Sequence, residues 1–465
     1  MSALALLPEK MTYASFLARK SVIDPDTGLH IIPDLNPMLF PHQADMVRWA
    51  LRRGRAAIFA DCGIGKGPMQ MEWAAKQPHD CIIAAPLAVA HQFVREAQKF
   101  GIDLAYAKDH AGITKRITVT NYERLENFHV EQFGAVALDE SSILKNYSGA
   151  YSSWMTEAFK NTPFRLCSSA TPAPNDIMEL GTQAEFLGVM TRGEMLAMYF
   201  THDGGDTSKW RVKGHAQSAF WTWMASWAVM IRKPSDLGYS DDGFTLPPLR
   251  MHEHCIDVTN PTGGFLFAVE AKTLQERQAA RRDSIADRVA ACADLVNSSD
   301  RPFLVWCNLN AESEALEKAI PDAVEVKGSD SDEHKEAAIV GFLDGRHRVM
   351  ISKPRIAGLG LNLQHCADMA FVGLSDSYEQ LYQAIRRCWR FGQDKAVNVH
   401  VITASTEGAV VSNIKRKERE AEETYDNMIA HMKDLNAAAL HGGQVRNKSE
   451  YRPQASLAIP EWLAA

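Results

Sequence analysis

A glycine-rich stretch between a predicted strand and a predicted helix is the sharpest chemical signal in the sequence. Residues 60–67 read ADCGIGKG, so Gly63 and Gly65 precede Lys66. Glycines let successive backbone amides turn toward phosphate oxygens, and the start of the next helix favours an anion. Lys66 would reach the β- and γ-phosphates of a nucleotide. Taken alone, the stretch is also explained by an ordinary strand–helix turn.

Gly67 departs from the phosphate-loop pattern, which has Ser or Thr at this position. The hydroxyl of that residue binds Mg²⁺, so the chain lacks one protein ligand for the cation. Mg²⁺ usually keeps several waters, and water can take the missing place. We therefore expect weaker handling of Mg²⁺ and ATP, and we expect Gly67→Thr to raise kcat or the affinity for Mg²⁺.

Two adjacent carboxylates follow the apolar run 135–138. Asp139 would hold Mg²⁺ directly or through water, and Glu140 would orient and polarise the attacking water. An acidic pair at the end of a strand is often only a solvated loop. Combined with a glycine-rich loop it indicates phosphoryl hydrolysis, because that reaction needs both parts.

Residues 383–393 read QAIRRCWRFGQ and form the third signal. Arg387 and Arg390 are three residues apart, which places them on one face of a predicted helix. Two guanidinium groups on one face would clamp a γ-phosphate across a cleft. A solvated basic helix face is the alternative, but it leaves the flanking glutamines, Gln383 and Gln393, unexplained.

Short apolar runs alternate with helical patterns such as 68–76 and 88–99, which predicts an α/β fold with parallel sheets covered on both faces. We predict buried strands at 56–60, 81–85, 117–120, 135–138 and 165–168, and again at 303–307, 323–326, 349–352, 369–372 and 398–402. The predicted organisation is an arm at 1–35, an α/β unit at 36–190, an insertion with linking helices at 191–298, a second α/β unit at 299–410, and a charged helix with a mobile tail at 411–465.

Two features of the insertion and its surroundings are open to two interpretations. The tryptophan-rich segment 210–227, in which Trp223 and Trp227 lie one helical turn apart with Phe220 on the same side, predicts core packing, with base stacking or a strand-separating wedge as the alternative. Residues 265–298 predict one long charged helix. Its arginine-rich part, 277–288, predicts a solvated face, with a basic face on DNA as the alternative.

The composition limits the class of protein. The 465 residues are 46% apolar and 23% charged with a net charge of −7, which excludes a disordered chain and a basic nucleic-acid coat. The eight cysteines form no C-x-x-C pair, which favours a reducing compartment. The sequence has no apolar run long enough for a membrane helix and no signal-peptide pattern at its start. These features predict a cytoplasmic protein without membrane contact.

The order of the motifs resembles helicase superfamily two, and within it the Swi/Snf-like DNA translocases. The similarity runs from about residue 39 to 402, through the stretches 40–43, 60–67, 85–87, 118–122, 139–140, 168–172, 305–308, 357–363 and 383–393. The compact format is similar to that of helicases encoded by phages and prophages, so the expected setting is a bacterial or phage-infected cell.

The resemblance implies two RecA-like lobes of the P-loop type, with ATP and Mg²⁺ bound between them. Gln43 would read adenine, and Gly63, Gly65, Lys66, Gly67, Asp139 and Gly360 would contact the nucleotide or its metal. Glu140 would position water, while Gln383, Arg387 and Arg390 would come from the second lobe. DNA, duplex or single-stranded, would lie across both lobes on Thr120, Ser168, Ser169, Asn308 and Ser352, for which loop capping is the alternative role.

The function expected from this resemblance is an ATP-dependent DNA translocase or helicase. The first alternative is a nucleic-acid-binding scaffold with impaired hydrolysis, suggested by Gly67. The second is a P-loop ATPase that acts on proteins, against which the motifs at 357–363 and 383–393 weigh. The direction of movement, strand separation, oligomeric state and protein partners do not follow from the sequence.

Overall fold

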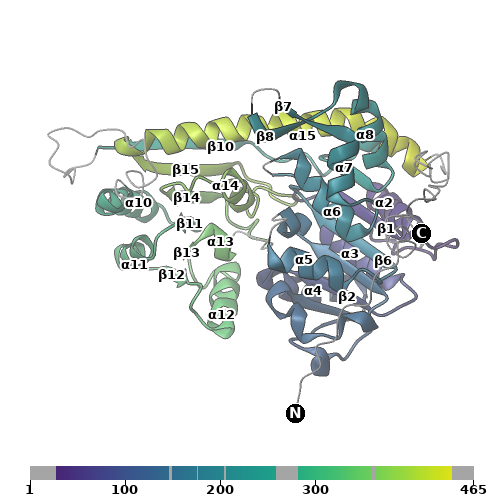
Figure 1. The fold of residues 1–465 in the computed structure, drawn as a ribbon. Helices are drawn as coiled ribbons and strands as arrows, with labels where there is room; N and C mark the ends of the chain where they lie inside the picture. Colours follow the sequence, from purple (N-terminus) through teal and green to yellow (C-terminus); the bar gives the residue numbers. More distant parts are fainter. Residues whose placement is uncertain are drawn as a thin grey trace, which may run out of the picture.

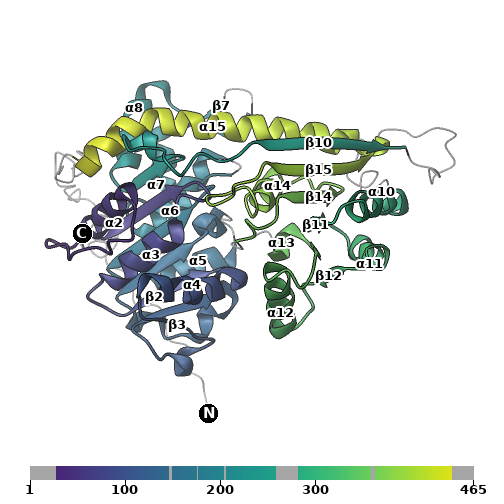
Figure 2. The same cartoon turned by 180° about the vertical axis from the view of Figure 1, so that it is seen from behind.

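Two α/β lobes lie side by side and one long helix crosses both (Figures 1 and 2). The computed structural model describes residues 28–145, 149–174, 176–203, 206–257, 281–357 and 362–441. A seven-stranded sheet forms the first lobe and a six-stranded sheet forms the second, and the strand pairs in both are parallel. The predicted fold class of two RecA-like parallel-sheet lobes is confirmed.

The first sheet has the order β3-β4-β2-β5-β6-β1-β9. Its strands are β1 (Arg55–Ala60), β2 (Cys81–Ala85), β3 (Leu104–Tyr106), β4 (Ile117–Asn121), β5 (Ala135–Asp139), β6 (Phe164–Ser169) and β9 (Ala228–Ile231). The five apolar runs predicted in this lobe are all strands. They are continuous runs because both faces are buried, as is typical of parallel sheets.

Helices cover both faces of the first sheet. One apolar core lies under α2 (Pro41–Arg53), α3 (Lys66–Ala75) and α4 (Leu87–Phe100). The opposite core lies under α5 (Ala150–Ala158), α6 (Leu180–Leu187), α7 (Arg192–Tyr199) and α8 (Gln217–Ala225). Since α3 and α4 pack against each other, the glycine-rich loop 60–67, which is predicted to bind phosphate and is called the phosphate loop below, lines the same cavity as side chains of α4.

The second sheet has the order β10-β15-β14-β11-β13-β12. Its strands are β10 (Leu249–Ile256), β11 (Phe303–Cys307), β12 (Ala323–Val326), β13 (Val349–Ser352), β14 (Asp368–Val372) and β15 (Val397–Ala404). On one face lie α10 (Ile285–Asn297) and α11 (Asn310–Ala319); on the other lie α12 (Asp332–Leu343), α13 (Pro354–Ala357) and α14 (Tyr378–Ile385). All five strands predicted here are present.

The range 191–298 needs a correction, because it supplies a strand to each sheet. β9 pairs with β1, and β10 pairs with β15 along its whole length. Between α7 and α8 a small antiparallel hairpin is formed by β7 (Phe200–Asp203) and β8 (Asp206–Val212). β10 escapes prediction because it is an edge strand with alternating exposure and no continuous apolar run.

The tryptophan-rich segment packs in the core of the first lobe. Trp221, Trp223 and Trp227 are all buried. The ring of Trp223 lies 5.4 Å from the rings of Tyr199 and Trp227, centroid to centroid. The prediction of core packing is confirmed, because a buried ring cannot stack on a base from solvent.

Replacing the indole of Trp223 should therefore destabilise the fold. We expect Trp223→Ala to lower the free energy of unfolding by about 3–5 kcal/mol, the usual cost of a large aromatic deletion in a core. Thermal unfolding followed by circular dichroism measures this change. Unchanged thermal stability together with a loss of DNA-dependent activity would contradict the core assignment.

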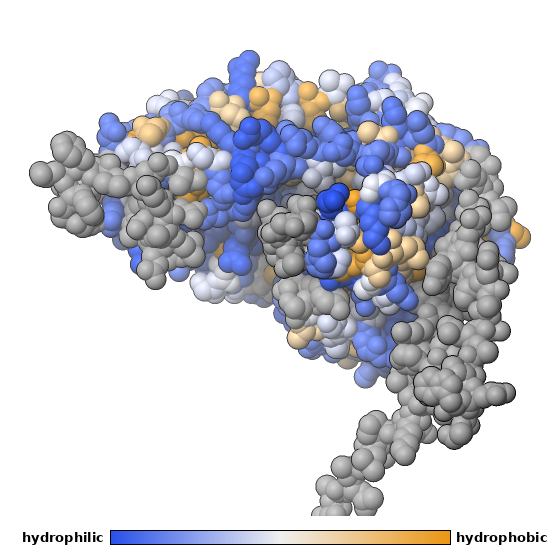
Figure 3. All heavy atoms as spheres, turned by 45° about the horizontal axis from the view of Figure 1, so that its top comes forward, coloured by the Kyte–Doolittle hydropathy of each residue, from blue (hydrophilic) through white to orange (hydrophobic). Residues whose placement is uncertain are grey.

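The last described helix, α15 (Gly408–His441), connects the two lobes along one side (Figure 1). Val410 and Ile414 lie in the core of the second lobe, whereas Met428 and Met432 lie in that of the first. Its face of the molecule is largely hydrophilic (Figure 3), in agreement with the charged helix predicted within 411–465. The helix differs from that expectation in its buried methionines.

Asn436 fixes the far end of α15 to the edge strand β9. Its side-chain amide donates to the Ala228 carbonyl at 3.0 Å, and its Oδ1 accepts from the Met230 amide at 3.1 Å. These contacts satisfy backbone groups that an edge strand otherwise leaves unpaired. Residues 1–27 of the predicted arm and residues 442–465 of the predicted tail lie outside the described residues.

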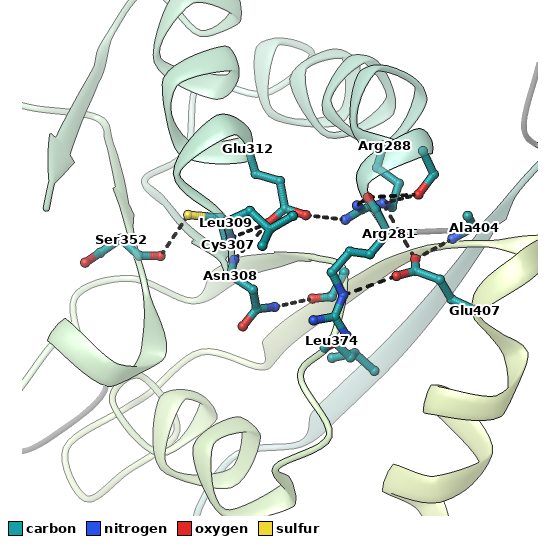
Figure 4. A network of polar contacts seen from close by, with 12 residues as sticks. Arg281, Arg288, Cys307, Asn308, Leu309, Glu312, Ser352, Leu374, Ala404 and Glu407 are labelled. Carbon is teal, nitrogen blue, oxygen red and sulfur yellow. Dashed lines mark hydrogen bonds and ion pairs between the residues drawn. The ribbon is translucent and has the colours of Figure 1, made fainter. Parts of the chain in front are cut away.

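Within the arginine-rich stretch 277–288, Arg282 is exposed, as a solvated face predicts, whereas Arg288 corrects that prediction (Figure 4). Arg288 is fully buried, and its Nη1 donates to Glu312 Oε1 at 2.8 Å. Its Nε lies 3.6 Å from Glu407 Oε2. Arg288 is therefore an interior ion-pair residue and lies on neither a solvated nor a DNA-facing surface. Of the long helix predicted over 265–298, α10 covers Ile285–Asn297, and 258–280 lie outside the described residues.

In the described ranges, no helix combines the length and apolar character that a bilayer crossing requires.

Candidate active site

A cavity of about 360 Å³ lies where the two lobes meet. The first lobe lines it with Gln43, Gly63, Gly65, Lys66, Gly67, Asp139 and Glu140, and the second lobe with Arg387 and Arg390. Residues far apart in the sequence thus share one polar cavity. Gly360, the remaining glycine predicted to contact nucleotide, lies outside the described residues.

The phosphate loop lies so close to its neighbours that side chains at two positions would clash. Gly63 and Gly65 have φ values of 93° and 99°, which side chains rarely adopt. A Cβ on Gly63 would lie 2.8 Å from the Phe391 backbone nitrogen of the second lobe. A Cβ on Gly65 would lie 2.2 Å from Gln43 Nε2. Glycine is therefore required both for the turn and for the approach of the second lobe.

Lys66 and Gln43 are both fastened to the loop backbone. Lys66 Nζ donates to the Ala60 carbonyl at 2.9 Å. Gln43 Nε2 donates to the Ile64 carbonyl at 2.7 Å, and Gln43 Oε1 accepts from the Phe40 amide at 3.1 Å. Gln43 is therefore in direct contact with the backbone of the loop.

Three aromatic rings meet at the edge of the cavity, and the sequence did not predict this meeting. Phe244 lies 5.0 Å from Phe40 and 4.8 Å from Phe391, measured between ring centroids. All three line the cavity. They come from three separate segments, so no local pattern could have grouped them. Together they form an apolar surface beside Gln43.

The two carboxylates at the end of β5 lie in different environments. Asp139 is buried, and its Oδ1 accepts from Gln70 Nε2 at 2.6 Å. Burial, followed by the charge of Glu140, raises the pKa of Asp139 to about 7, although Gln70, Lys66 and Arg387 act in the opposite direction. Burial thus penalises the charged form of this carboxyl until a cation compensates it.

The backbone of Glu140 adopts a strained conformation. Its φ of 54° is the only positive value found for a non-glycine residue in the described ranges. The side chain is 8% exposed, and its Oε2 has no hydrogen-bond partner in the described part of the chain. A buried carboxylate oxygen without a donor fits a position that water occupies.

The carboxylates suit a hydrated Mg²⁺ better than a metal held by protein alone. Among the described residues, no three His, Cys, Asp or Glu side chains gather into a metal site. Mg²⁺ at nucleotide sites is commonly held by one or two carboxylates, waters and phosphate oxygens. Asp139, at the end of β5 beside the phosphate loop, matches that donor set.

The raised pKa of Asp139 has a measurable consequence. Its folded form prefers the neutral carboxyl, so ionisation lowers the stability of the nucleotide-free protein as pH rises from the unfolded value of 3.8 to about 7. We expect Asp139→Asn, which is always neutral, to raise the Tm above that of the wild type at about pH 8 and to have a much smaller effect at about pH 4.

The same group should make metal-dependent nucleotide binding sensitive to pH. Mg²⁺ needs the ionised carboxylate, so affinity should fall about tenfold per pH unit below the pKa of Asp139. Thermal unfolding and nucleotide titration across this range measure both effects. A Tm of Asp139→Asn equal to or below that of the wild type at the higher pH would contradict the assignment.

The arginines of 383–393 lie in the cavity but not on a helix. α14 ends at Ile385, and Arg387 and Arg390 lie in the turns that follow it, which corrects the predicted helix face. Arg387 donates from Nε to the Gln383 carbonyl and from Nη2 to Gln383 Oε1, both at 2.8 Å. Gln383 Nε2 reaches Thr171 Oγ1 of the first lobe at 3.4 Å. Gln383 therefore orients one arginine and contacts the opposite lobe.

An ion pair beside the phosphate loop joins the lobes and was not predicted. Arg386 pairs through Nη2 with Asp61 Oδ2, and the Tyr382 hydroxyl donates to Asp61 Oδ1 at 2.6 Å. Lys145 of the first lobe also pairs with Glu379 of the second. Asp61 and Arg386 are 325 positions apart, so local sequence holds no signal of their contact.

Most residues predicted to hold nucleic acid are buried in the sheets. Thr120, Ser168, Ser169 and Ser352 have no exposed surface. Ser352 Oγ donates to the Val326 carbonyl at 3.0 Å. As placed, these four side chains are shielded from solvent, and contact with DNA at these positions stays a prediction.

Asn308 differs from the four buried residues because it is only half-buried. Its amide donates to the Gly373 carbonyl at 3.3 Å, and its backbone nitrogen donates to Glu312. These contacts agree with the alternative role of loop capping, and contact with DNA stays a prediction for Asn308.

A comparison with protein families matches residues 287–392 to the helicase conserved C-terminal domain. Among curated proteins, the chain is 22% identical over 433 residues to the Mus musculus protein named DNA annealing helicase and endonuclease ZRANB3, covering 82% of this chain and 40% of that protein. The Bos taurus protein of the same name is 22% identical over 435 residues, covering 81% and 39%. The chain thus spans about two fifths of the length of these relatives.

Among solved structures, the chain is similar to the Sulfolobus solfataricus SWI2/SNF2 ATPase core in complex with dsDNA. The TM-score is 0.40 and the identity 16%, with 88% of this chain and 98% of that chain covered. The family match and the curated relatives confirm the predicted resemblance.

Proposed function

We propose, on the premise that this chain is a Swi/Snf-like relative of the superfamily-two helicases, that it is an ATP-driven DNA translocase. One observation carries the proposal. A single cavity gathers the phosphate loop with Lys66, the acidic pair, and two arginines from the opposite lobe. Phosphoryl transfer depends on positioning and charge stabilisation, and these are the groups that supply both.

The residues of the first lobe would hold the nucleotide and the attacking water. The loop amides and Lys66 would hold the phosphates, while Gln43 and Phe244, which line the same cavity, would contact the base. Asp139 would hold Mg²⁺, which neutralises phosphate charge when bound. Glu140 orients water through its unpartnered Oε2.

The second lobe would complete the site on closure. Arg387 and Arg390 bring positive charge to the side of the cavity opposite the phosphate loop. Since these groups stand on different lobes, hydrolysis requires the lobes to be together, and product release allows them to part. Repeated closing and opening is the motion that would move the protein along DNA.

DNA is the proposed track because the curated relatives are named as DNA annealing helicases. Grip through phosphates rather than bases suits a protein that must bind any sequence. We propose movement on duplex DNA, and strand separation is not part of the proposal.

Steady-state ATP hydrolysis with Mg²⁺ tests this function, measured without polymer and with single-stranded DNA, duplex DNA or RNA. We expect duplex DNA to stimulate hydrolysis, and Glu140→Gln to abolish it, which excludes a contaminating ATPase. Hydrolysis that no nucleic acid changes would contradict the proposal. DNA binding without any hydrolysis would instead identify the scaffold that Gly67 suggests.

A further inference from the structure

Glu96 occupies the space beside the position where the phosphate loop lacks a side chain. Gly67 lies in the first turn of α3. The nearest atom to the Cβ that Gly67 lacks is Oε2 of Glu96, at 3.2 Å. Glu96 belongs to α4, which packs against α3, and it lines the same cavity as Lys66 and Asp139.

The carboxylate of Glu96 is held in this orientation by its own helix. Gln92, one turn earlier, donates from Nε2 to Glu96 Oε1 at 2.6 Å. That contact engages one oxygen, and the other oxygen faces Gly67. A side chain so fixed loses little further freedom when it binds a ligand.

We propose that Glu96 supplies the oxygen contact to nucleotide-bound Mg²⁺, directly or through one water, that Ser or Thr provides at the position of Gly67. This inference rests on the proposed function, since it concerns the cation of the same ATP site. The chemistry fits because Mg²⁺ prefers oxygen ligands and is often bound through carboxylates. A negatively charged group from α4 thus replaces a neutral hydroxyl from the loop.

The added charge makes a distinctive prediction. A carboxylate beside a phosphate site repels the triphosphate unless a cation stands between them. Glu96 should therefore weaken nucleotide binding without Mg²⁺ and strengthen it with Mg²⁺. A hydroxyl group cannot have both effects, because it carries no charge.

Another possible role of Glu96 predicts a different dependence of nucleotide binding on Mg²⁺. The charge of Glu96 also acts on Arg390. If Glu96 served only to hold Arg390 away from the phosphates, its removal would tighten nucleotide binding equally with and without Mg²⁺.

Titration of a fluorescent, non-hydrolysable ATP analogue from EDTA through increasing Mg²⁺ separates these roles. We expect Glu96→Gln to raise the Mg²⁺ concentration at half-maximal binding by about tenfold or more. Without Mg²⁺, the variant should bind the analogue as well as the wild type or better. Mn²⁺ in place of Mg²⁺, counted by electron paramagnetic resonance, reports the cation itself. Glu131→Gln, an exposed carboxylate of the same lobe, is the matched control.

The substitution Gly67→Ser, which introduces a hydroxyl at position 67, completes the test. In the wild type a new Cβ at this position lies against Glu96 Oε2, so Gly67→Ser should gain little. In the Glu96→Gln background the same change should restore the Mg²⁺ requirement toward that of the wild type. The gain that the sequence predicts for Gly67→Thr is therefore expected only in that background.

The outcomes separate this inference from the proposed function. An unchanged Mg²⁺ requirement in Glu96→Gln, or equally tightened binding with and without Mg²⁺, overturns the inference and leaves DNA-stimulated hydrolysis standing. A wild-type protein that binds no nucleotide even with Mg²⁺ overturns both.

Discussion

Glu140→Gln is expected to lower DNA-stimulated ATP hydrolysis by about 10²–10⁴-fold, the usual range for loss of a positioned acid–base group. ATP affinity should change by no more than a small factor, because the proposed role of Glu140 is to orient water rather than to hold the nucleotide. The variant keeps the size of the side chain and removes its charge. Its effect therefore falls on the chemical step.

The local backbone supports this expectation. Glu140 keeps a positive φ of 54° and a buried, unpartnered Oε2, both of which cost stability. Such features persist where the surrounding structure enforces them, and the apolar strand β5 fixes this one. We therefore expect Glu140→Gln to be at least as thermally stable as the wild type.

Single-turnover hydrolysis with saturating duplex DNA, together with nucleotide titration, measures both effects. Glu131→Gln again serves as the control for loss of a carboxylate on the same lobe. Hydrolysis by Glu140→Gln within tenfold of the wild type would remove Glu140 from the proposed chemistry.

Arg387→Ala should have an equal or larger effect, about 10³–10⁵-fold in kcat, as is typical of arginine fingers. The Arg387 guanidinium is buried, held by Gln383, and close enough to Asp139 to affect its pKa. Removing it takes away positive charge that faces the phosphate loop only when the lobes meet. Nucleotide binding to the first lobe should survive.

Arg387→Lys tests whether charge alone is sufficient. Arginine presents a planar fork, and both of its contacts to Gln383 use that geometry. We expect lysine to recover less than a tenth of the lost rate. Arg346→Ala, an exposed arginine of the same lobe, is the control. A kcat unchanged in Arg387→Ala would contradict the closed site described above.

Direct side-chain contacts join the two lobes around the proposed site. Asp61 and Arg386 pair beside the phosphate loop, and Gln383 touches Thr171 across the junction. The loop and the arginines are therefore linked by direct side-chain contacts. If nucleotide binding moves the loop, these contacts would carry the change to the second lobe.

The sequence by itself determined the parts of the protein that depend on neighbouring residues. Each predicted strand was found, because a strand buried on both faces must be a continuous apolar run. The glycine-rich loop and the acidic pair could be proposed as site residues because each is a short continuous stretch next to a predicted strand. The fold class and the resemblance to Swi/Snf-like helicases followed from these local patterns and their order.

Only the tertiary structure decided which distant residues meet. It placed β10, a strand with no apolar run, at the edge of the second sheet, and it buried Arg288 against Glu312 and Glu407. It also brought Glu96 to the space beside Gly67 and joined Asp61 to Arg386. These contacts depend on how helices and lobes pack, and packing is set by the whole buried surface rather than by any short stretch of sequence.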